Sequence, residues 1–213
     1  MNRLAPAAFE LIFLIAAAPD PLQRQLIADA KATKPVAFER TLRQELAGKS
    51  VVYVDRYDPA RTQPWALVSI DGRAPKPDEM GAWRTTIRNG VPAYARVAIL
   101  LGAAEKVDDT HYRVAKMPKG FMSRDGFADH LSAQLTIDTS APKPFVREVH
   151  FYAAQPFRMF MVVKVDKFDA INRYGPDAGG IPRIVAQDTT IVGSGPGMSG
   201  AQATHLTFKP LTQ

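Results

Sequence analysis

The sequence contains no cysteine among its 213 residues. This absence excludes disulfide bonds, thiol nucleophiles and every zinc, iron–sulfur or haem site that requires a thiolate ligand. It also excludes the lipid-modified cysteine of a bacterial lipoprotein. If the protein folds outside the cytoplasm, its hydrophobic core alone must therefore stabilise it.

Runs of basic residues are absent too, although the net charge is +6 at pH 7. Lysine and arginine are scattered along the chain, whereas a nucleic-acid-binding surface concentrates them on one face or one helix. Hydrophobic residues make up 46% of the chain and charged residues 23%, which is typical of a globular protein. We therefore expect a folded protein with no nucleic-acid partner.

Motifs for metal and phosphate binding are lacking as well. The four histidines are His111, His130, His150 and His205. They include no HxH or HExxH spacing, and solvent-facing strand positions explain them, so we expect no metal and no other cofactor. The glycine-rich segment 193–200 has no Lys-Ser/Thr ending and precedes a strand, which indicates a flexible hairpin loop rather than a phosphate-binding loop.

The segment 56–84 holds four carboxylates, and each has a sufficient structural explanation. Asp58 and Asp71 stand directly before a proline and a glycine, which is typical of turns. Asp78 and Glu79 fall at the expected start of a helix, where the helix dipole favours negative charge. A catalytic pair would require two of them to converge, so we expect no catalytic residue here and no enzyme activity.

The first 18 residues have the pattern of a secretory signal peptide. Arg3 provides a positive start, a short apolar run follows at 11–18, and this run is too short to span a bilayer. A buried N-terminal helix is the alternative. We expect residues 1–18 to be a signal peptide, residues 19–213 to form one domain, and the mature protein to be periplasmic.

Hydrophobic periodicity predicts an α+β fold dominated by strands. Helical spacing, with Asp20 as the cap, predicts a helix over 20–32, and two further helices are expected within 77–102. Period-two alternation predicts strands over 36–46, 50–57, 65–70, 110–117, 129–138, 144–152, 157–168, 181–192 and 203–211. Hairpin-sized gaps between these segments favour one antiparallel meander of about ten strands, curved, with helices covering its concave face.

Several stretches together resemble a known family. They are YDPAR, SIDGRAP, HLSAQLTIDTSAPKPFVREVHFYAAQPFR and VVKVDKFDAINRYGPDAGGIPRIVAQ. Over residues 36–213 the order of strands and turns is similar to that of exported bacterial proteins with the outer-membrane lipoprotein carrier (LolA/LppX-like) fold. The resemblance implies a half-barrel of about eleven strands that is closed by helices over an apolar cavity. It also implies a functional cavity arginine, for which Arg40, Arg43 and Arg56 are all candidates.

The resemblance implies a binding or carrier protein for a lipid, an acyl chain or a lipidated partner, with transient contact to a membrane or to envelope proteins. Burial of each methylene would contribute about 0.8 kcal/mol to binding. The candidate lining residues are Trp65, Leu67, Met80, Trp83, Leu135, Phe151, Met159 and Met161. Motion of residues 77–102 would open the cavity. The alternative is a non-catalytic interaction or stress-sensing module of the envelope with a solid core, and a hydrolase ranks third.

Overall fold

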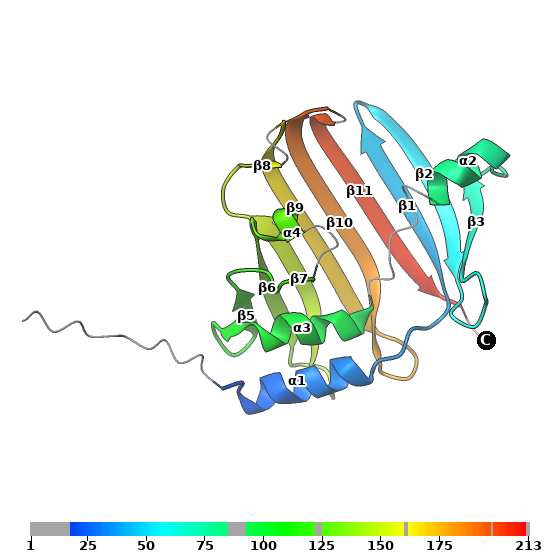
Figure 1. Cartoon of the computed structure of the whole chain (residues 1–213). Coiled ribbons are helices and arrows are strands. Elements are labelled where there is room, and N and C mark those ends of the chain that lie inside the picture. Colours follow the sequence, from blue (N-terminus) through cyan, green and yellow to red (C-terminus); the bar gives the residue numbers. More distant parts are fainter. Residues whose placement is uncertain (1–17, 85–92, 122–124, 160–161, 197, 212–213) are drawn as a thin grey trace, which may run out of the picture.

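The computed structural model describes residues 18–84, 93–121, 125–159, 162–196 and 198–211, and it contains one large antiparallel sheet with a few short helices (Figure 1). The strands are β1 Phe38–Leu46, β2 Lys49–Tyr57, β3 Trp65–Ile70, β4 Glu105–Lys106, β5 His111–Val114, β6 Leu131–Asp138, β7 Phe145–Ala153, β8 Phe157–Met159, β9 Val163–Pro176, β10 Pro182–Gly195 and β11 Met198–Pro210. The helices are α1 Pro21–Ala32, α2 Pro77–Ala82, the 3-10 turn η2 Tyr94–Arg96, α3 Val97–Gly102 and α4 Asp125–Ala128.

The sheet is open and has the strand order β3-β2-β1-β11-β10-β9-β7-β6-β5-β4, with β8 paired to β9. The predicted simple meander is therefore wrong in one respect. After β3 the chain leaves one edge of the sheet, and residues 71–104 carry it to the opposite edge at β4. As a result, β11 lies in the middle of the sheet, hydrogen-bonded to both β1 and β10.

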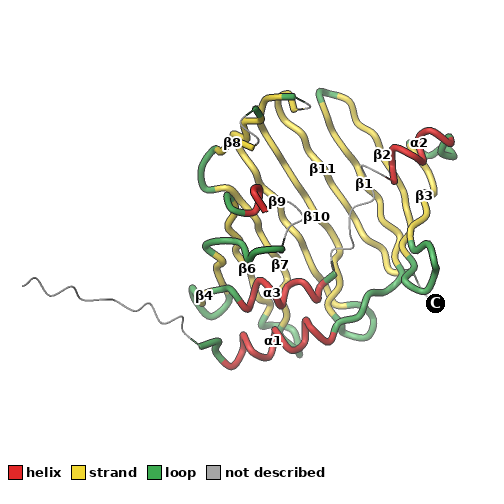
Figure 2. The backbone as a smooth tube through the Cα atoms, viewed as in Figure 1, coloured by secondary structure: helices red, strands yellow, loops and turns green. Residues whose placement is uncertain are grey.

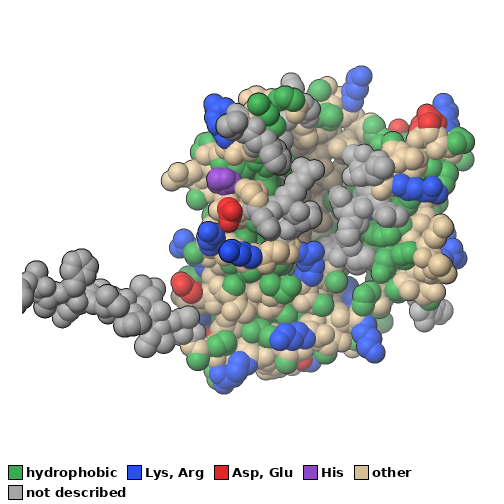
Figure 3. Space-filling view, viewed as in Figure 1, with side chains coloured by type: hydrophobic (Ala, Val, Ile, Leu, Met, Phe, Trp, Pro, Cys, Tyr) green, Lys and Arg blue, Asp and Glu red, His purple; other side chains and the backbone are tan. Residues whose placement is uncertain are grey.

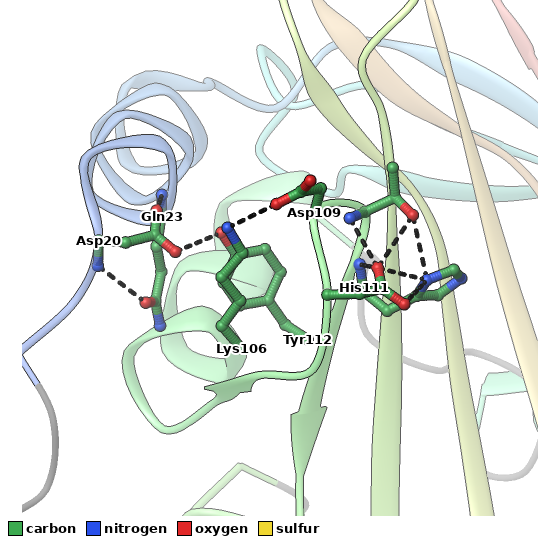
Figure 4. Close-up of polar contacts among 8 residues, drawn as sticks. Asp20, Gln23, Lys106, Asp109, His111 and Tyr112 are labelled. Atoms are coloured by element: carbon green, nitrogen blue, oxygen red, sulfur yellow. Dashed lines mark hydrogen bonds and ion pairs between the residues drawn. The ribbon is translucent and has the colours of Figure 1, made fainter.

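Helix α1 begins as predicted, because Asp20 caps it. The Asp20 carboxylate accepts a hydrogen bond from the backbone nitrogen of Gln23 at 2.9 Å, and Pro21 occupies the first turn. The Tyr112 hydroxyl donates to the same carboxylate at 2.8 Å, which ties the start of α1 to β5 (Figure 4). These bonds, that from the Gln23 backbone first, lower the pKa of Asp20.

Helices α1 and α3 lie side by side across one end of the strands (Figure 2). Gln23 connects them, since its side-chain nitrogen donates to the carbonyl oxygens of Leu101 at 2.7 Å and Ala104 at 3.0 Å. Carbonyl groups at the end of a helix have no partner within the helix, so a buried side chain from α1 satisfies the end of α3. Gln23 is only 4% exposed.

Replacement of Gln23 by methionine is expected to lower the free energy of unfolding by about 1–3 kcal/mol, because shielded carbonyl groups would lose their donor. Urea unfolding followed by circular dichroism measures the change. Gln25→Met is the matched control, since Gln25 lies in the same helix and is exposed. Equal stability of the two variants would contradict the role assigned to Gln23.

One face of the sheet, here called the buried face, carries the hydrophobic core. On β6 the predicted alternation is confirmed, because Leu131, Ala133, Leu135 and Ile137 are all at most 2% exposed. The pairing of β6 with β7, of β9 with β10 and of β11 with β1 places the buried residues of these strands on the same face. The core residues of α1 and α3 belong to the same hydrophobic cluster, so the helices and the sheet share one core.

Three local predictions require correction. The segment 157–168 is not one strand but a hairpin of β8 and β9, in which Met159 pairs with Val163. The glycine-rich segment is mostly strand, since β10 and β11 pair up to Gly195 and Met198. His130 lies in a turn after α4, a helix that the sequence pattern did not predict, and its ring stacks on that of Phe157.

The opposite face of the sheet, here called the exposed face, carries charges that are paired across strands. Arg56 on β2 contacts Glu39 on β1 at 2.9 Å, and Asp188 on β10 contacts both His205 and Arg173. On the other side of the molecule, from which Figure 3 views it with α3 and α4 in front of the sheet, Lys and Arg side chains are dispersed as well. Among the described residues, none of the helices combines the length and the apolar composition needed to cross a membrane.

Candidate functional site

A buried ion pair lies on the buried face of the two strands β1 and β2. Arg40 and Asp55 are directly opposite in the register, and they form two hydrogen bonds, Nε–Oδ1 at 2.9 Å and Nη2–Oδ2 at 2.6 Å. Their side chains are 1% and 0% exposed. Of the three arginines proposed from the sequence, Arg40 is therefore the one inside the protein, whereas Arg43 and Arg56 are exposed.

Two tryptophans complete the surroundings of this ion pair. The indole nitrogen of Trp83, which follows α2, donates to Asp55 Oδ2 at 3.0 Å. The guanidinium carbon of Arg40 lies 4.5 Å from the centroid of the Trp65 ring on β3, a cation–π distance. A buried carboxylate with bonds from both a guanidinium and an indole is well satisfied, so the pair is stable in a medium of low polarity.

A bulge in the pairing of β2 with β3 shapes this part of the sheet. The register shifts between Val54 and Asp55, so that Leu67 lies opposite Asp55 and Trp65 lies opposite Tyr57. An extra residue in an edge strand bends it and redirects its side chains. The bulge therefore places both Trp65 and Leu67 on the buried face, next to the ion pair.

Helix α2 is held to the chain before it by exposed contacts. Glu79 accepts a hydrogen bond from the Lys76 backbone nitrogen at 2.8 Å and forms an ion pair with Arg73. These two interactions, that with Arg73 first, lower the pKa of Glu79 to about 2. The structural role predicted for this carboxylate is confirmed, and its position fixes the helix that carries Trp83.

The turn roles predicted for two further carboxylates are also confirmed. Asp58 accepts hydrogen bonds from the Ala60 backbone nitrogen at 3.0 Å and from the Arg61 side chain at 3.2 Å. Asp71 has a positive φ of 49° and accepts from the Val52 backbone nitrogen at 2.8 Å. Both side chains therefore stabilise turns rather than point into a common site.

An aromatic cluster adjoins the ion pair. The ring of Phe38 lies 5.2 Å from Tyr57, 5.7 Å from Trp65 and 5.4 Å from Phe208, measured between centroids. The rings of Tyr57 and Trp65 are 5.1 Å apart. Separations of this kind contribute about 0.5–1.5 kcal/mol per pair beyond the burial of area. The cluster forms a continuous wall from β3 to β11.

An apolar hollow lies on the other side of that wall, between the sheet and η2. Its described lining residues are Thr33, Lys34, Pro35, Val36, Phe38, Ala93, Tyr94, Arg183, Ile184, Phe208 and Pro210. Its cavity volume is about 40 Å³, and it is partly open to solvent. Carbon-rich side chains dominate the lining, so the hollow suits a hydrocarbon group better than a charged one.

Tyr94 and Arg183 fix two sides of the hollow. The Tyr94 hydroxyl accepts a hydrogen bond from the backbone nitrogen of Val146 at 2.9 Å, and burial raises the pKa of this tyrosine. Arg183 contacts Asp177 at 2.9 Å and donates to the carbonyl of Lys34 at 2.6 Å. Since Arg183 already has a carboxylate partner, it is not an unsatisfied charge inside the hollow.

The lining residues predicted from the sequence fall into two groups that lie far apart in the strand order. One group lies on β3 and α2 or directly after it: Trp65, Leu67, Met80 and Trp83. The other group lies on β6, β7 and β8: Leu135, Phe151 and Met159. Six strands separate β3 from β6 in the sheet. Met161 lies outside the described residues, and the ligand-binding role of all eight residues stays a prediction.

Asp55 and the walls of the hollow were not predicted from the sequence. A signal was present, because Arg40 alternates with Phe38 and Leu42 on the apolar side of its strand. An arginine at such a position requires a carboxylate nearby. Which carboxylate provides it depends on the pairing of β1 with β2, and the sequence pattern alone does not give this register.

Among the described residues, no group of three or more histidines and carboxylates is arranged to hold a metal ion. Comparisons of the chain with protein-family models, with curated proteins and with solved structures give no match. The assignment of a function therefore depends on the geometry of the site.

Proposed function

We propose that the protein is a non-catalytic binding or carrier protein that holds an acyl chain, a lipid or a lipidated partner on the buried face of its sheet. The observation that carries this proposal is the apolar hollow between the sheet and η2. Its cavity volume of about 40 Å³ is smaller than the roughly 300–1,000 Å³ of a ligand pocket, so a hydrocarbon chain would enter only as the surrounding segments move apart. Its Phe38 and Phe208 walls continue into the aromatic cluster beside the ion pair.

Binding would occur by partition of a hydrocarbon chain out of water. Each buried methylene contributes about 0.8 kcal/mol, so several methylenes suffice for measurable affinity without a specific polar contact. The hollow is rimmed by Val36 and Pro35 in the segment between α1 and β1. This segment has no regular secondary structure, which favours it as the entrance for a chain.

Helix α2 would act as the moving element. Its connection to the buried face depends on Trp83, and the hydrogen bond from Trp83 to Asp55 joins it to the ion pair. In this proposal Arg40, which lies beside the hollow rather than in its described lining, corresponds to the arginine implied by the carrier family. Release of Trp83 would uncover Asp55 beside the aromatic wall, and Arg40 would keep Asp55 in place.

The remaining parts of the carrier hypothesis belong to the same proposal. Export through residues 1–18, of which only Ala18 belongs to the described part of the chain, would deliver the protein to the periplasm. The helices across one end of the strands and the open sheet are compatible with a half-barrel whose concave face they cover. Partners would then be lipids or lipidated proteins, with transient contact to the membrane or to envelope proteins.

A solid-core interaction module of the envelope remains a second candidate, and one observation favours it. Leu135 and Phe151, two of the predicted lining residues, are 0% and 5% exposed and pack within the main core. That half of the buried face is therefore filled with side chains. Native mass spectrometry of protein purified from its own cells separates the candidates. Co-purified lipid supports the carrier, whereas a clean mass without ligand supports the module.

Substitution of Val36 by tryptophan is expected to weaken the binding of 1-decanol about tenfold or more. The indole would occupy the rim of the hollow and displace at least two methylenes of the ligand. Isothermal titration calorimetry measures the affinity. Ile181→Trp is the control, because Ile181 is 42% exposed and is not among the described lining residues. Unchanged affinity of the Val36 variant would contradict this location of the site.

A further inference from the structure

A band of uncharged polar side chains crosses the buried face of the sheet, further along the strands that border the hollow. Its members are Gln44 on β1, Thr204 on β11, Thr189 and Gln187 on β10, and Asn172 on β9. The register places Gln44 opposite Thr204, Thr204 opposite Thr189, and Gln187 opposite Asn172. Gln44, Thr204 and Asn172 alternate with the buried apolar residues Leu42, Leu206 and Ala170. Four adjacent strands therefore present carboxamides and hydroxyls on the same face as the core.

These side chains have unused hydrogen-bonding capacity. In the described part of the chain, Gln44, Gln187, Thr189 and Thr204 make no side-chain hydrogen bond, and all four are half-buried. Asn172 is hydrogen-bonded to the hydroxyl of Tyr174, which is 8% exposed. The Asn172 side-chain oxygen is nevertheless shielded from solvent and has no partner. Whichever way the carboxamide is turned, one of its polar atoms lacks a partner.

Within the band, the Asn172 oxygen is the polar atom that is both shielded and unpaired, and such an atom costs about 1–3 kcal/mol. The exposed face of the same strands shows the contrast. There, Asp188 and Thr190 flank Thr189 in sequence, and Asp188 is paired with His205 and Arg173. A ligand that supplies hydrogen bonds to the band would offset the penalty.

The band also restricts the chemistry of that ligand. It contains no charged side chain, and the nearby Arg40 is neutralised by Asp55. An ionised carboxylate, phosphate or ammonium at this position would be desolvated without a counter-charge, which is unfavourable. Carboxamides both donate and accept, as do hydroxyls. Hydroxyl groups on the ligand would satisfy both kinds of side chain at once.

We infer that the band binds the head group of the carried molecule and that this head group is neutral and rich in hydroxyls, as in a sugar or a glycerol. This inference rests on the proposed function. The band and the hollow share strands β1, β10 and β11, and Phe208 of the hollow follows Thr204 of the band by four residues, about 14 Å along β11. A hydrocarbon tail in the hollow therefore places a head group within reach of the band.

Three probes with the same decyl chain test the inference: decyl glucoside, 1-decanol and decanoate. Each is titrated into the full chain by calorimetry below its micelle concentration. We expect decyl glucoside to bind at least about tenfold more tightly than either of the others, because two hydrogen bonds of typical strength together give about this factor. Equal binding of all three would overturn the inference and leave the proposed function intact. Failure of all three to bind would overturn both.

A matched pair of variants locates the head group. The double variant Gln187→Met with Thr189→Val keeps the side-chain volumes and removes the polar atoms. It is expected to lose about tenfold in affinity for decyl glucoside and to keep its affinity for 1-decanol within about twofold. Thr190→Val, on the exposed face beside Thr189, is the control and should change neither. Retained binding of 1-decanol also shows that the double variant is folded, and undiminished binding of decyl glucoside to it would refute the inference.

Discussion

Replacement of Asp55 by alanine is expected to lower the free energy of unfolding by about 3–5 kcal/mol. The Arg40 guanidinium is 1% exposed, and the substitution would remove the carboxylate to which it makes two hydrogen bonds. Trp83 would lose its acceptor as well. A buried charge without its counter-charge is among the largest single causes of destabilisation. Urea unfolding followed by tryptophan fluorescence measures the effect, since both tryptophans lie beside the ion pair.

Two controls make this expectation specific. Glu39→Ala removes an ion pair with Arg56 from the same two strands, one register position away and on the exposed face, and should cost less than about 1 kcal/mol. The double variant Arg40→Met with Asp55→Leu removes both charges together and should recover most of the lost stability. A double variant as unstable as Asp55→Ala would show that burial of charge is not the cause.

Replacement of Leu101 by alanine is expected to lower the free energy of unfolding by about 2–5 kcal/mol. Leu101 is 0% exposed and belongs to the cluster in which α1, α3 and the sheet meet. The loss combines the transfer free energy of the removed carbons with the cavity that remains. Since α3 directly follows η2, the same variant should also weaken ligand binding in the hollow that η2 borders.

Ile99→Ala is the matched control for Leu101→Ala. Ile99 lies in the same short helix but is 50% exposed, so the substitution should cost less than about 1 kcal/mol. Thermal or urea unfolding compares the two variants directly. Similar losses for both would indicate that helix propensity, rather than packing against the sheet, determines the contribution of α3.

The sequence predicted the local elements well where a single physical signal dominated. Asp20 before Pro21 predicted the start of α1, and the alternation in β6 predicted its buried side, because both signals depend only on neighbours in sequence. The hairpin of β8 and β9 was missed since its residues alternate as they would in one long strand. Apolar periodicity does not distinguish a continuous strand from two strands that turn back on each other.

The site was less predictable than the fold because it depends on contacts between distant segments. Arg40 could be recognised as unusual, but its partner Asp55 and the cover provided by Trp83 follow from register and from the position of α2. The same holds for the hollow, whose walls Phe38 and Phe208 come from opposite ends of the chain. The lining residues that the sequence pattern predicted, mostly methionines and aromatics, lie in both halves of the sheet and do not form one site.

The central position of β11 has a consequence for biosynthesis. Strand β11 is the last in the chain, and it is the only described strand that pairs with both β1 and β10. Both halves of the sheet are therefore synthesised before the strand that connects them. Contacts between such distant segments form slowly. A nascent chain of this kind stays incompletely folded until translation reaches Pro210, and a product that stops before β11 lacks the strand that joins the two halves of the sheet.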